Sequence, residues 1–72
     1  RSELREAIDA TIERMDEHHR TPFLMREVED RTYEEIAEAI GIPVGTVKSR
    51  LFLARAHLQN VISSYLKGEV SA

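Results

Sequence analysis

Apolar and polar residues recur along the chain with the period of an α-helix, and no segment alternates with the period of a β-strand. From Glu3 to Met15, one apolar stripe faces a charged opposite side, and Ser2 is suited to cap the start of a helix. We therefore expect a first helix over this range, with a stripe turned toward the core that consists of Leu4, Ile8, Ile12 and Met15.

A second helix is expected between Glu17 and Val28, and Pro22 within this range should disturb its regular hydrogen bonding. A proline lacks the backbone N–H and its ring clashes with the preceding turn. We expect either a kink there, or a short turn followed by a restart with Thr21 as the cap and Pro22 at the first helical position. The side chains expected to face inward are Phe23, Leu24 and Val28.

The third helix has the clearest start signal in the chain. Thr32 followed three residues later by Glu35 is a capping box, in which each side chain accepts from the other residue's amide. Gly41 is expected to end this helix, because the left-handed conformation costs glycine little. The buried side should consist of Ile36, Ala37 and Ile40.

A fourth helix is expected to begin at Pro43 or Val44, to continue to about Leu66 and to stop at Gly68. Its apolar stripe consists of Val47, Leu51, Ala54, Leu58, Ile62 and Tyr65.

Residues 33–52 fit a helix-turn-helix, a unit with characteristic residues at fixed offsets. It needs a small residue where its helices cross, then a left-handed turn, then a branched apolar residue that grips the first helix. Ala37, Gly41 and Val47 meet these needs, although a plain helical hairpin would use the same glycine turn. Arg50 stands where many such units have an apolar residue, and we expect Leu51 to take over that position. We predict an all-α fold, a four-helix domain containing a helix-turn-helix with a long C-terminal recognition helix.

The recognition helix can be divided around its axis at about 100° per residue. When the Val47 stripe faces inward, an uncharged face lies opposite it, and cations lie on both flanks. This arrangement is typical of a helix that enters a DNA groove, since small side chains can approach base edges while cations meet phosphates. The outward residues are Gly45, Ser49, Phe52, Leu53 and Ala56, with Thr46 close by; Lys48 and Arg55 lie on one flank and Arg50 on the other.

Three outward side chains are candidates for contact with bases. Thr46 and Ser49 can hydrogen-bond to base edges, and Phe52 can pack on a thymine methyl. An exposed Phe52–Leu53 pair has an alternative explanation, which is packing on another domain or subunit.

The charge distribution changes the meaning of the net charge of -3. Residues 1–42 carry six arginines and twelve acids, a net of -6, whereas residues 43–72 carry four cations against Glu69, a net of +3. Nucleic acid responds to a local basic face rather than to the average. The alternative is a solvated charge asymmetry that has no partner.

Several classes of site are not expected. The chain has no cysteine, and adjacent His18 and His19 would point about 100° apart on a helix, so neither a metal nor another cofactor is predicted. The chain contains neither a glycine-rich phosphate loop nor a nucleophile motif, so no enzyme is predicted. No apolar run approaches a membrane span and no signal peptide is visible. We expect residues 1–72 to form one cytoplasmic domain, and the start at Arg1 suggests a fragment of a longer chain.

Residues 33–51, YEEIAEAIGIPVGTVKSRL, closely resemble region 4 of bacterial sigma factors, the extracytoplasmic-function group in particular. The upstream run RTPFLMREVE over residues 20–29 is similar to the same region, and the likeness covers about residues 12–59. The resemblance implies that double-stranded promoter DNA is bound at the minus-35 element, as part of RNA polymerase holoenzyme at the bacterial nucleoid. It also implies contact with the flap of the polymerase beta subunit and, often, control by an anti-sigma factor.

By position, the resemblance implies DNA contacts at Arg26, Pro43, Gly45, Thr46, Lys48, Ser49 and Phe52; the flank positions of Arg50 and Arg55 add two phosphate contacts. Two departures affect this expectation. Leu53 stands where relatives often have a DNA-contacting arginine, and Met15-Asp16 stands where Leu-Pro is common. Region 2, which melts the minus-10 element, is not part of the chain, so we do not expect this chain alone to direct initiation.

Two alternative functions remain open at this point. A response-regulator output domain also carries Thr-Val-Lys at its recognition helix, but the run from Ser49 to Arg55 favours a sigma factor. A helical protein-docking module would use the acidic first half and no DNA, and the cations around Thr46 and Ser49 argue against it.

Overall fold

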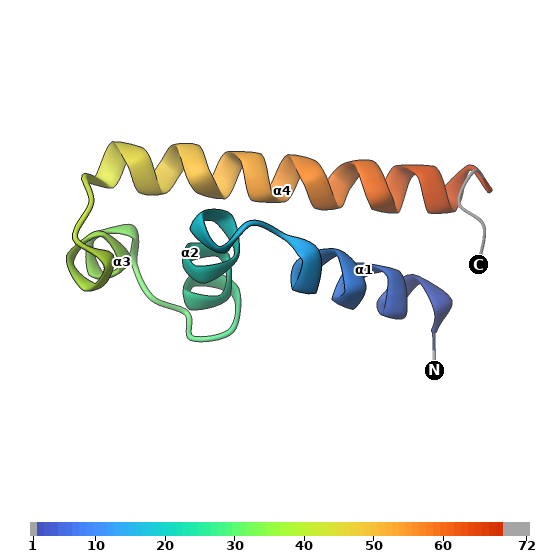
Figure 1. Ribbon diagram of the computed structural model, residues 1–72, viewed down its shortest axis with the longest axis horizontal. Coiled ribbons are helices and arrows are strands. Elements are labelled where there is room, and N and C mark those ends of the chain that lie inside the picture. The colour runs from blue at the N-terminus through green and yellow to red at the C-terminus, as the bar shows by residue number, and fades with distance from the viewer. Residues whose placement is uncertain (1, 69–72) are drawn as a thin grey trace.

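A computed structural model describes residues 2–68 and contains four helices (Figure 1). They are α1 (Glu3–Arg14), α2 (Glu17–Glu27), α3 (Tyr33–Ile40) and α4 (Val44–Leu66). No strand occurs within these residues, so the predicted all-α, four-helix fold is confirmed. No helix in the described part of the chain is both long and apolar enough to cross a membrane.

The last helix is the platform on which the other three pack. Its 23 residues span roughly 35 Å at the usual rise of an α-helix, which accounts for most of the 39 Å long axis of the molecule. Helix α3 lies against the N-terminal end of α4, α2 crosses its middle, and α1 lies along its C-terminal half (Figure 1). The position of every other element is therefore defined relative to α4.

The core is concentrated where α2, α3 and α4 meet. Ile36 and Val47 are completely buried and Leu51 is 1% exposed. The predicted stripe of α4 is confirmed for its first four residues, whereas Ile62 and Tyr65 are half-buried. The remaining buried side chains of this cluster are Met15, Phe23, Ala37, Ala54 and Leu58.

Helix α2 runs without interruption through Pro22, so the predicted restart at Thr21 is wrong. Asp16 is the actual cap, and its Oδ1 accepts from the His18 amide at 2.8 Å. A proline inside a helix loses one backbone hydrogen bond. The Pro22 ring is among the most deeply buried side chains of the molecule, and this burial offsets the loss.

The inward direction predicted for Val28 is also wrong, since this side chain is 74% exposed. Phe23 is buried and sets the inward side of α2. A residue five positions later lies about 140° away around a helix axis. Val28 is also the C-cap of α2, so it stands at the point where the chain leaves the helix.

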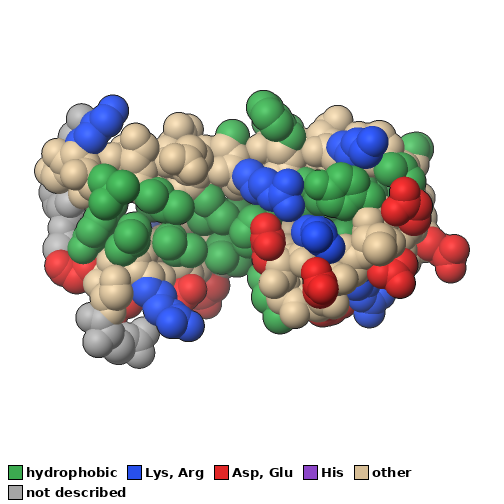
Figure 2. Space-filling view, turned by 180° about the vertical axis from the view of Figure 1, so that it is seen from behind, with side chains coloured by type: hydrophobic (Ala, Val, Ile, Leu, Met, Phe, Trp, Pro, Cys, Tyr) green, Lys and Arg blue, Asp and Glu red, His purple; other side chains and the backbone are tan. Residues whose placement is uncertain are grey.

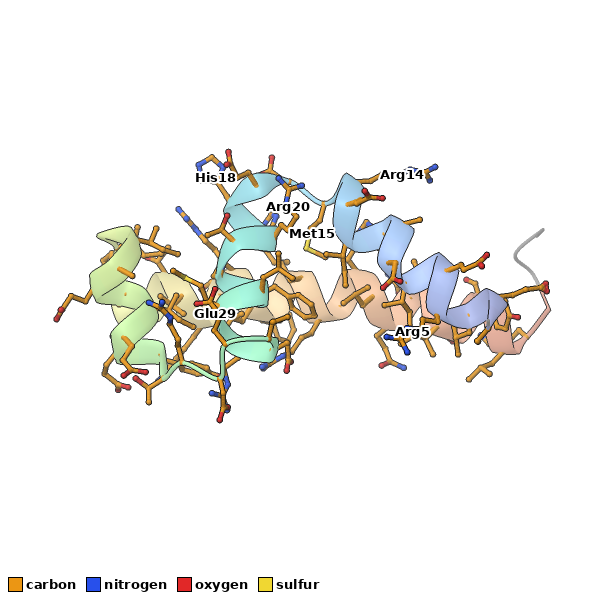
Figure 3. All side chains as sticks on the ribbon, turned by 90° about the horizontal axis from the view of Figure 1, so that it is seen from below. Arg5, Arg14, Met15, His18, Arg20 and Glu29 are labelled. Carbon is orange, nitrogen blue, oxygen red and sulfur yellow. The ribbon has the colours of Figure 1, made fainter. Side chains whose placement is uncertain are left out.

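The junction of α1 and α2 is closed by one arginine. The Arg20 guanidinium donates from Nη1 to the carbonyl oxygens of Glu13 and Met15, at 3.0 and 2.9 Å. These carbonyls belong to the C-terminal end of α1, where helix acceptors lack intrahelical partners. Figure 3 shows Arg20 and Met15 side by side at this junction.

Helix α1 covers the C-terminal half of α4 incompletely. The α1 stripe residues Leu4, Ile8 and Ile12 are only half-buried, and Leu66 at the end of α4 is 73% exposed. Figure 2 shows the hydrophobic side chains of this half of the molecule gathered in one apolar patch. We use the name α1–α4 patch for the large apolar side chains of α1 and of the last turns of α4 that are half-buried or exposed, namely Leu4, Ile8, Ile12, Val61, Ile62, Tyr65 and Leu66.

Candidate nucleic-acid interface

The turn between α3 and α4 is built by the residues that the sequence indicates. The Glu35 amide donates to Thr32 Oγ1 at 3.0 Å and the Thr32 amide donates to Glu35 Oε1 at 2.8 Å, which confirms the capping box. At the other end of α3, Gly41 has a φ of 82°, in the left-handed region. The amides of Gly41 and Ile42 both donate to the Ala37 carbonyl, at 2.8 and 3.1 Å, so the helix is closed before α4 begins.

The packing of α3 on α4 fixes how α4 is rotated about its axis. Val47 is completely buried and Ala37 is 8% exposed. Leu51 is buried while its neighbour Arg50 is half-buried, which confirms that Leu51 takes the core position. Since one side of α4 is held in the core, the opposite side has a defined composition.

That opposite side carries no charged residue at its centre. Gly45 and Ser49 are exposed, Phe52 is 72% exposed and Leu53 is 54% exposed. Thr46 and Ala56 are half-buried at its edges. The outward face predicted from helical geometry is therefore present, and Phe52 and Leu53 give it an apolar centre.

The start of α4 combines an exposed backbone with the positive end of a long helix. Pro43 is the N-cap and makes no side-chain capping bond, while its carbonyl accepts from the Thr46 and Val47 amides. The amides of Val44 and Gly45 lie in the first turn, where helix donors have no intrahelical acceptor. Such an end attracts anions. A Cβ added at Gly45 would meet nothing within 4 Å, so the fold itself does not require glycine there.

The cations around this face fall into two groups. Among the described residues, Lys48 and Arg50 form no ion pair. Arg26 instead donates from Nη1 to the Arg31 carbonyl at 2.8 Å and to Asp30 Oδ1 at 3.3 Å, which ties the end of α2 to the following loop. Arg55 is also engaged within the protein.

The Arg55 guanidinium connects three helices. Its Nη1 donates to the Tyr33 hydroxyl of α3 and its Nη2 to Glu27 Oε1 of α2, both at 3.5 Å. The hydrogen bond to Tyr33 and the charge of Glu27 raise the pKa of Arg55, so this side chain stays charged.

A family model described as Sigma-70, region 4 matches residues 5–58, which include α1 from Arg5, all of α2 and α3, and about the N-terminal two thirds of α4. The chain belongs to this family. The ECF RNA polymerase sigma-E factor of Haemophilus influenzae is 44% identical to this chain over 61 residues, which are 85% of this chain and 32% of that protein. The sigma-E factor of Escherichia coli (strain K12) is 40% identical over 65 residues, 90% of this chain and 34% of that protein. The chain thus spans about a third of the length of these relatives.

Two residues of this region 4 domain were not anticipated as parts of the interface. Tyr33 begins α3, and its ring lines a shallow hollow of about 520 Å³ with Lys48, Phe52 and Arg55. Glu27 reaches the same place from α2. Glu27 and Tyr33 lie 28 and 22 residues before Arg55, so no local spacing rule relates them to it.

His18 contacts the cap at the start of α2. His18 Nδ1 lies 3.1 Å from Asp16 Oδ1, and hydrogen bonds from the His18 amide and ring lower the pKa of Asp16. Within residues 2–68, no three His, Asp or Glu side chains lie close enough to hold a metal together.

Proposed function

We propose that this region 4 domain is the promoter-recognition part of a longer sigma factor and that it binds the minus-35 element as part of RNA polymerase holoenzyme. The observation that carries this proposal is the outward face of α4, uncharged at its centre and flanked by cations on both sides. The two relatives described above are named RNA polymerase sigma factors, which supports the same role. The role is binding rather than catalysis, and it belongs to the bacterial cytoplasm, at the nucleoid.

Within this proposal, the centre of α4 contacts bases. Thr46 and Ser49 hydrogen-bond to base edges, and Phe52 packs on a thymine methyl. Phe52 is suited to this role because it is largely exposed and carries no charge that would seek a phosphate. Pro43 and Gly45 are small residues at the helix start that allow the DNA backbone to approach closely.

The flanking cations contact phosphates on the two walls of the groove. Lys48 and Arg50 form no ion pair with any residue in the described range 2–68, so their charges can meet a phosphate without first breaking one there. Arg26 and Arg55 share their guanidinium groups with protein acceptors and are still 35% and 45% exposed. A guanidinium has five N–H donors, so each can bind a phosphate while it keeps an internal bond.

A direct test is selection of duplexes from a random library by the 72-residue chain, followed by sequencing. We expect enrichment of one short motif about the length that a single helix reads in the major groove. If selected duplexes remain random in sequence while the chain binds DNA, base readout by α4 is wrong. If no duplex is retained at low salt, the DNA-binding role itself is wrong.

The opposite end of the molecule provides a surface for protein partners. The α1–α4 patch is apolar and partly exposed, and the acidic residues Glu3, Asp9 and Glu13 lie on the same helix α1. Apolar surface rimmed by charge is typical of a protein-binding site. We propose that the polymerase beta-subunit flap binds this patch and that an anti-sigma factor, where one exists, competes for it.

Binding of an isolated beta flap to this chain tests that role. Leu66→Asp places a charge in the patch, and Val28→Asp is a matched control, since both side chains are nearly equally exposed. Loss of flap binding in the Leu66 variant alone is expected. Equal binding by both variants would exclude the patch as the docking site.

A further inference from the structure

Arg55 is held over a carboxylate of its own chain on the flank of α4. Its Nη2 lies 3.5 Å from Glu27 Oε1, and the two side chains are 45% and 47% exposed. Lys48 is on the same flank two turns earlier and has no such partner among the described residues. Figure 2 shows Lys and Arg side chains interleaved with Asp and Glu in the half of the molecule that holds α2 and α3.

Stability does not explain this pair well. Exposed ion pairs contribute little to folding, because water screens the charges and both side chains lose freedom. Glu27 lies in the last turn of α2, where a negative charge opposes the helix dipole. Its position therefore costs α2 some stability while it neutralises a cation on the proposed DNA-binding flank.

We propose that Glu27 occupies, in the free protein, the place that a DNA phosphate takes at Arg55, and that it thereby sets the affinity and salt dependence of DNA binding. This inference rests on the proposed function. A phosphate that binds Arg55 at Nη2 must displace Glu27, while the bond from Nη1 to the Tyr33 hydroxyl is kept. The phosphate then lies within several ångströms of a released carboxylate. Like charges at that separation repel even in water. Glu27 is thus an affinity-setting residue rather than a DNA contact.

Two measurable consequences follow from the charge of Glu27. Removal of this charge should tighten binding to any duplex, because a phosphate then no longer has to displace an anion from Arg55. It should also steepen the salt dependence by up to about 1 in the slope of log K against log salt. In the wild-type chain the released carboxylate gathers a cation from solution, which cancels part of the counterion release from DNA.

The experiment compares the 72-residue wild-type chain with Glu27→Gln, Arg55→Ala and the double variant. Binding to a random-sequence duplex is measured by fluorescence anisotropy at several salt concentrations. Glutamine retains an oxygen that can accept from Arg55, so this change removes the charge and leaves a hydrogen bond possible. Glu29→Gln is the matched control, because Glu29 is 49% exposed and pairs with a different arginine, Arg31, at 2.7 Å.

We expect Glu27→Gln to bind about threefold more tightly at low salt and with a steeper slope, and Glu29→Gln to gain clearly less. The gain should vanish in the Arg55→Ala background. Equal or weaker binding by Glu27→Gln, or the same gain without Arg55, would overturn the inference. Melting temperatures from circular dichroism check that each variant is folded. Absence of wild-type binding would overturn the proposed function as well, so the two failures are distinguishable.

Discussion

The Ser49 hydroxyl donates to the carbonyl oxygen of Gly45, one turn earlier on the outward face of α4, at 3.1 Å. Because its proton is engaged with the backbone, this hydroxyl presents lone pairs to solvent. If Ser49 contacts a base as we propose, that base must act as the donor, which in the major groove means the amino group of adenine or cytosine. Gly45 is the other member of this pair, and its missing side chain leaves the same face open.

Gly45→Ala should separate folding from DNA binding. A Cβ at Gly45 meets nothing within the protein, and alanine is the better helix former, so stability should rise by up to about 1 kcal/mol. If DNA approaches the start of α4, the added methyl should weaken binding by about fivefold, roughly 1 kcal/mol. Urea unfolding and anisotropy titration measure the two effects. Unchanged affinity would mean that the DNA backbone does not approach this turn.

Substitution of Gly41 should lower the stability of the fold, whereas substitution of Gly45 should raise it, and the loss at Gly41 should come from the backbone conformation alone. Its φ of 82° is strained for any branched residue, although a Cβ there has open space. Gly41→Val should cost roughly 1–3 kcal/mol. Asparagine tolerates the left-handed region better, so Gly41→Asn should cost less. Equal unfolding free energies for the two variants would contradict a purely conformational role of this glycine.

The cap of α2 should make stability depend on pH in the acid range. The pKa of Asp16 is lowered from 3.8, mainly by the hydrogen bond from the His18 amide. A lowered pKa means that the cap stabilises the fold above the ordinary pKa and is lost as the pH falls through the lowered value. Melting temperatures of wild type and Asp16→Asn, taken from neutral pH downward, should converge in strong acid. A constant difference between them would show that the ionised cap does not contribute.

Local rules account for most of the helix positions. The capping box at Thr32 and Glu35 and the left-handed Gly41 depend only on neighbours in sequence, so both could be predicted. The position of Pro22 could not be predicted in this way, because its place inside α2 depends on the earlier Asp16 cap and on burial of its ring in the folded chain. Local rules therefore predict where a helix can start, and tertiary packing decides which start is used.

The candidate interface, too, could be predicted from the sequence only in part. The outward face of α4 follows from helical periodicity once Val47 is known to be buried. The pairing of Arg55 with Glu27 and Tyr33 brings together three helices, and the bond from Arg26 to the Arg31 carbonyl depends on the path of a loop. The sequence indicated these arginines as cations, but not that each is already engaged within the protein.

Acidic residues of α1 should be unimportant for DNA binding. Helix α1 lies along the C-terminal half of α4, away from the start of the recognition helix (Figure 1). Glu3→Lys and Glu13→Lys together should therefore change affinity for a selected duplex by less than about threefold. Abolished DNA binding in a variant that melts like wild type would mean that the domain is oriented differently on DNA.

The division of labour along α4 is the central claim, and one titration tests it most directly. Wild type, Ser49→Ala, Lys48→Ala and Arg50→Ala are titrated with a selected duplex and a random duplex at several salt concentrations. Ser49→Ala should cost roughly 1–3 kcal/mol on the selected duplex and little on the random one. Lys48→Ala and Arg50→Ala should weaken both duplexes about equally and lower the salt slope by about 1 each. If Ser49→Ala weakened both duplexes equally while Arg50→Ala lost only specificity, the rotational placement of α4 on DNA would be wrong.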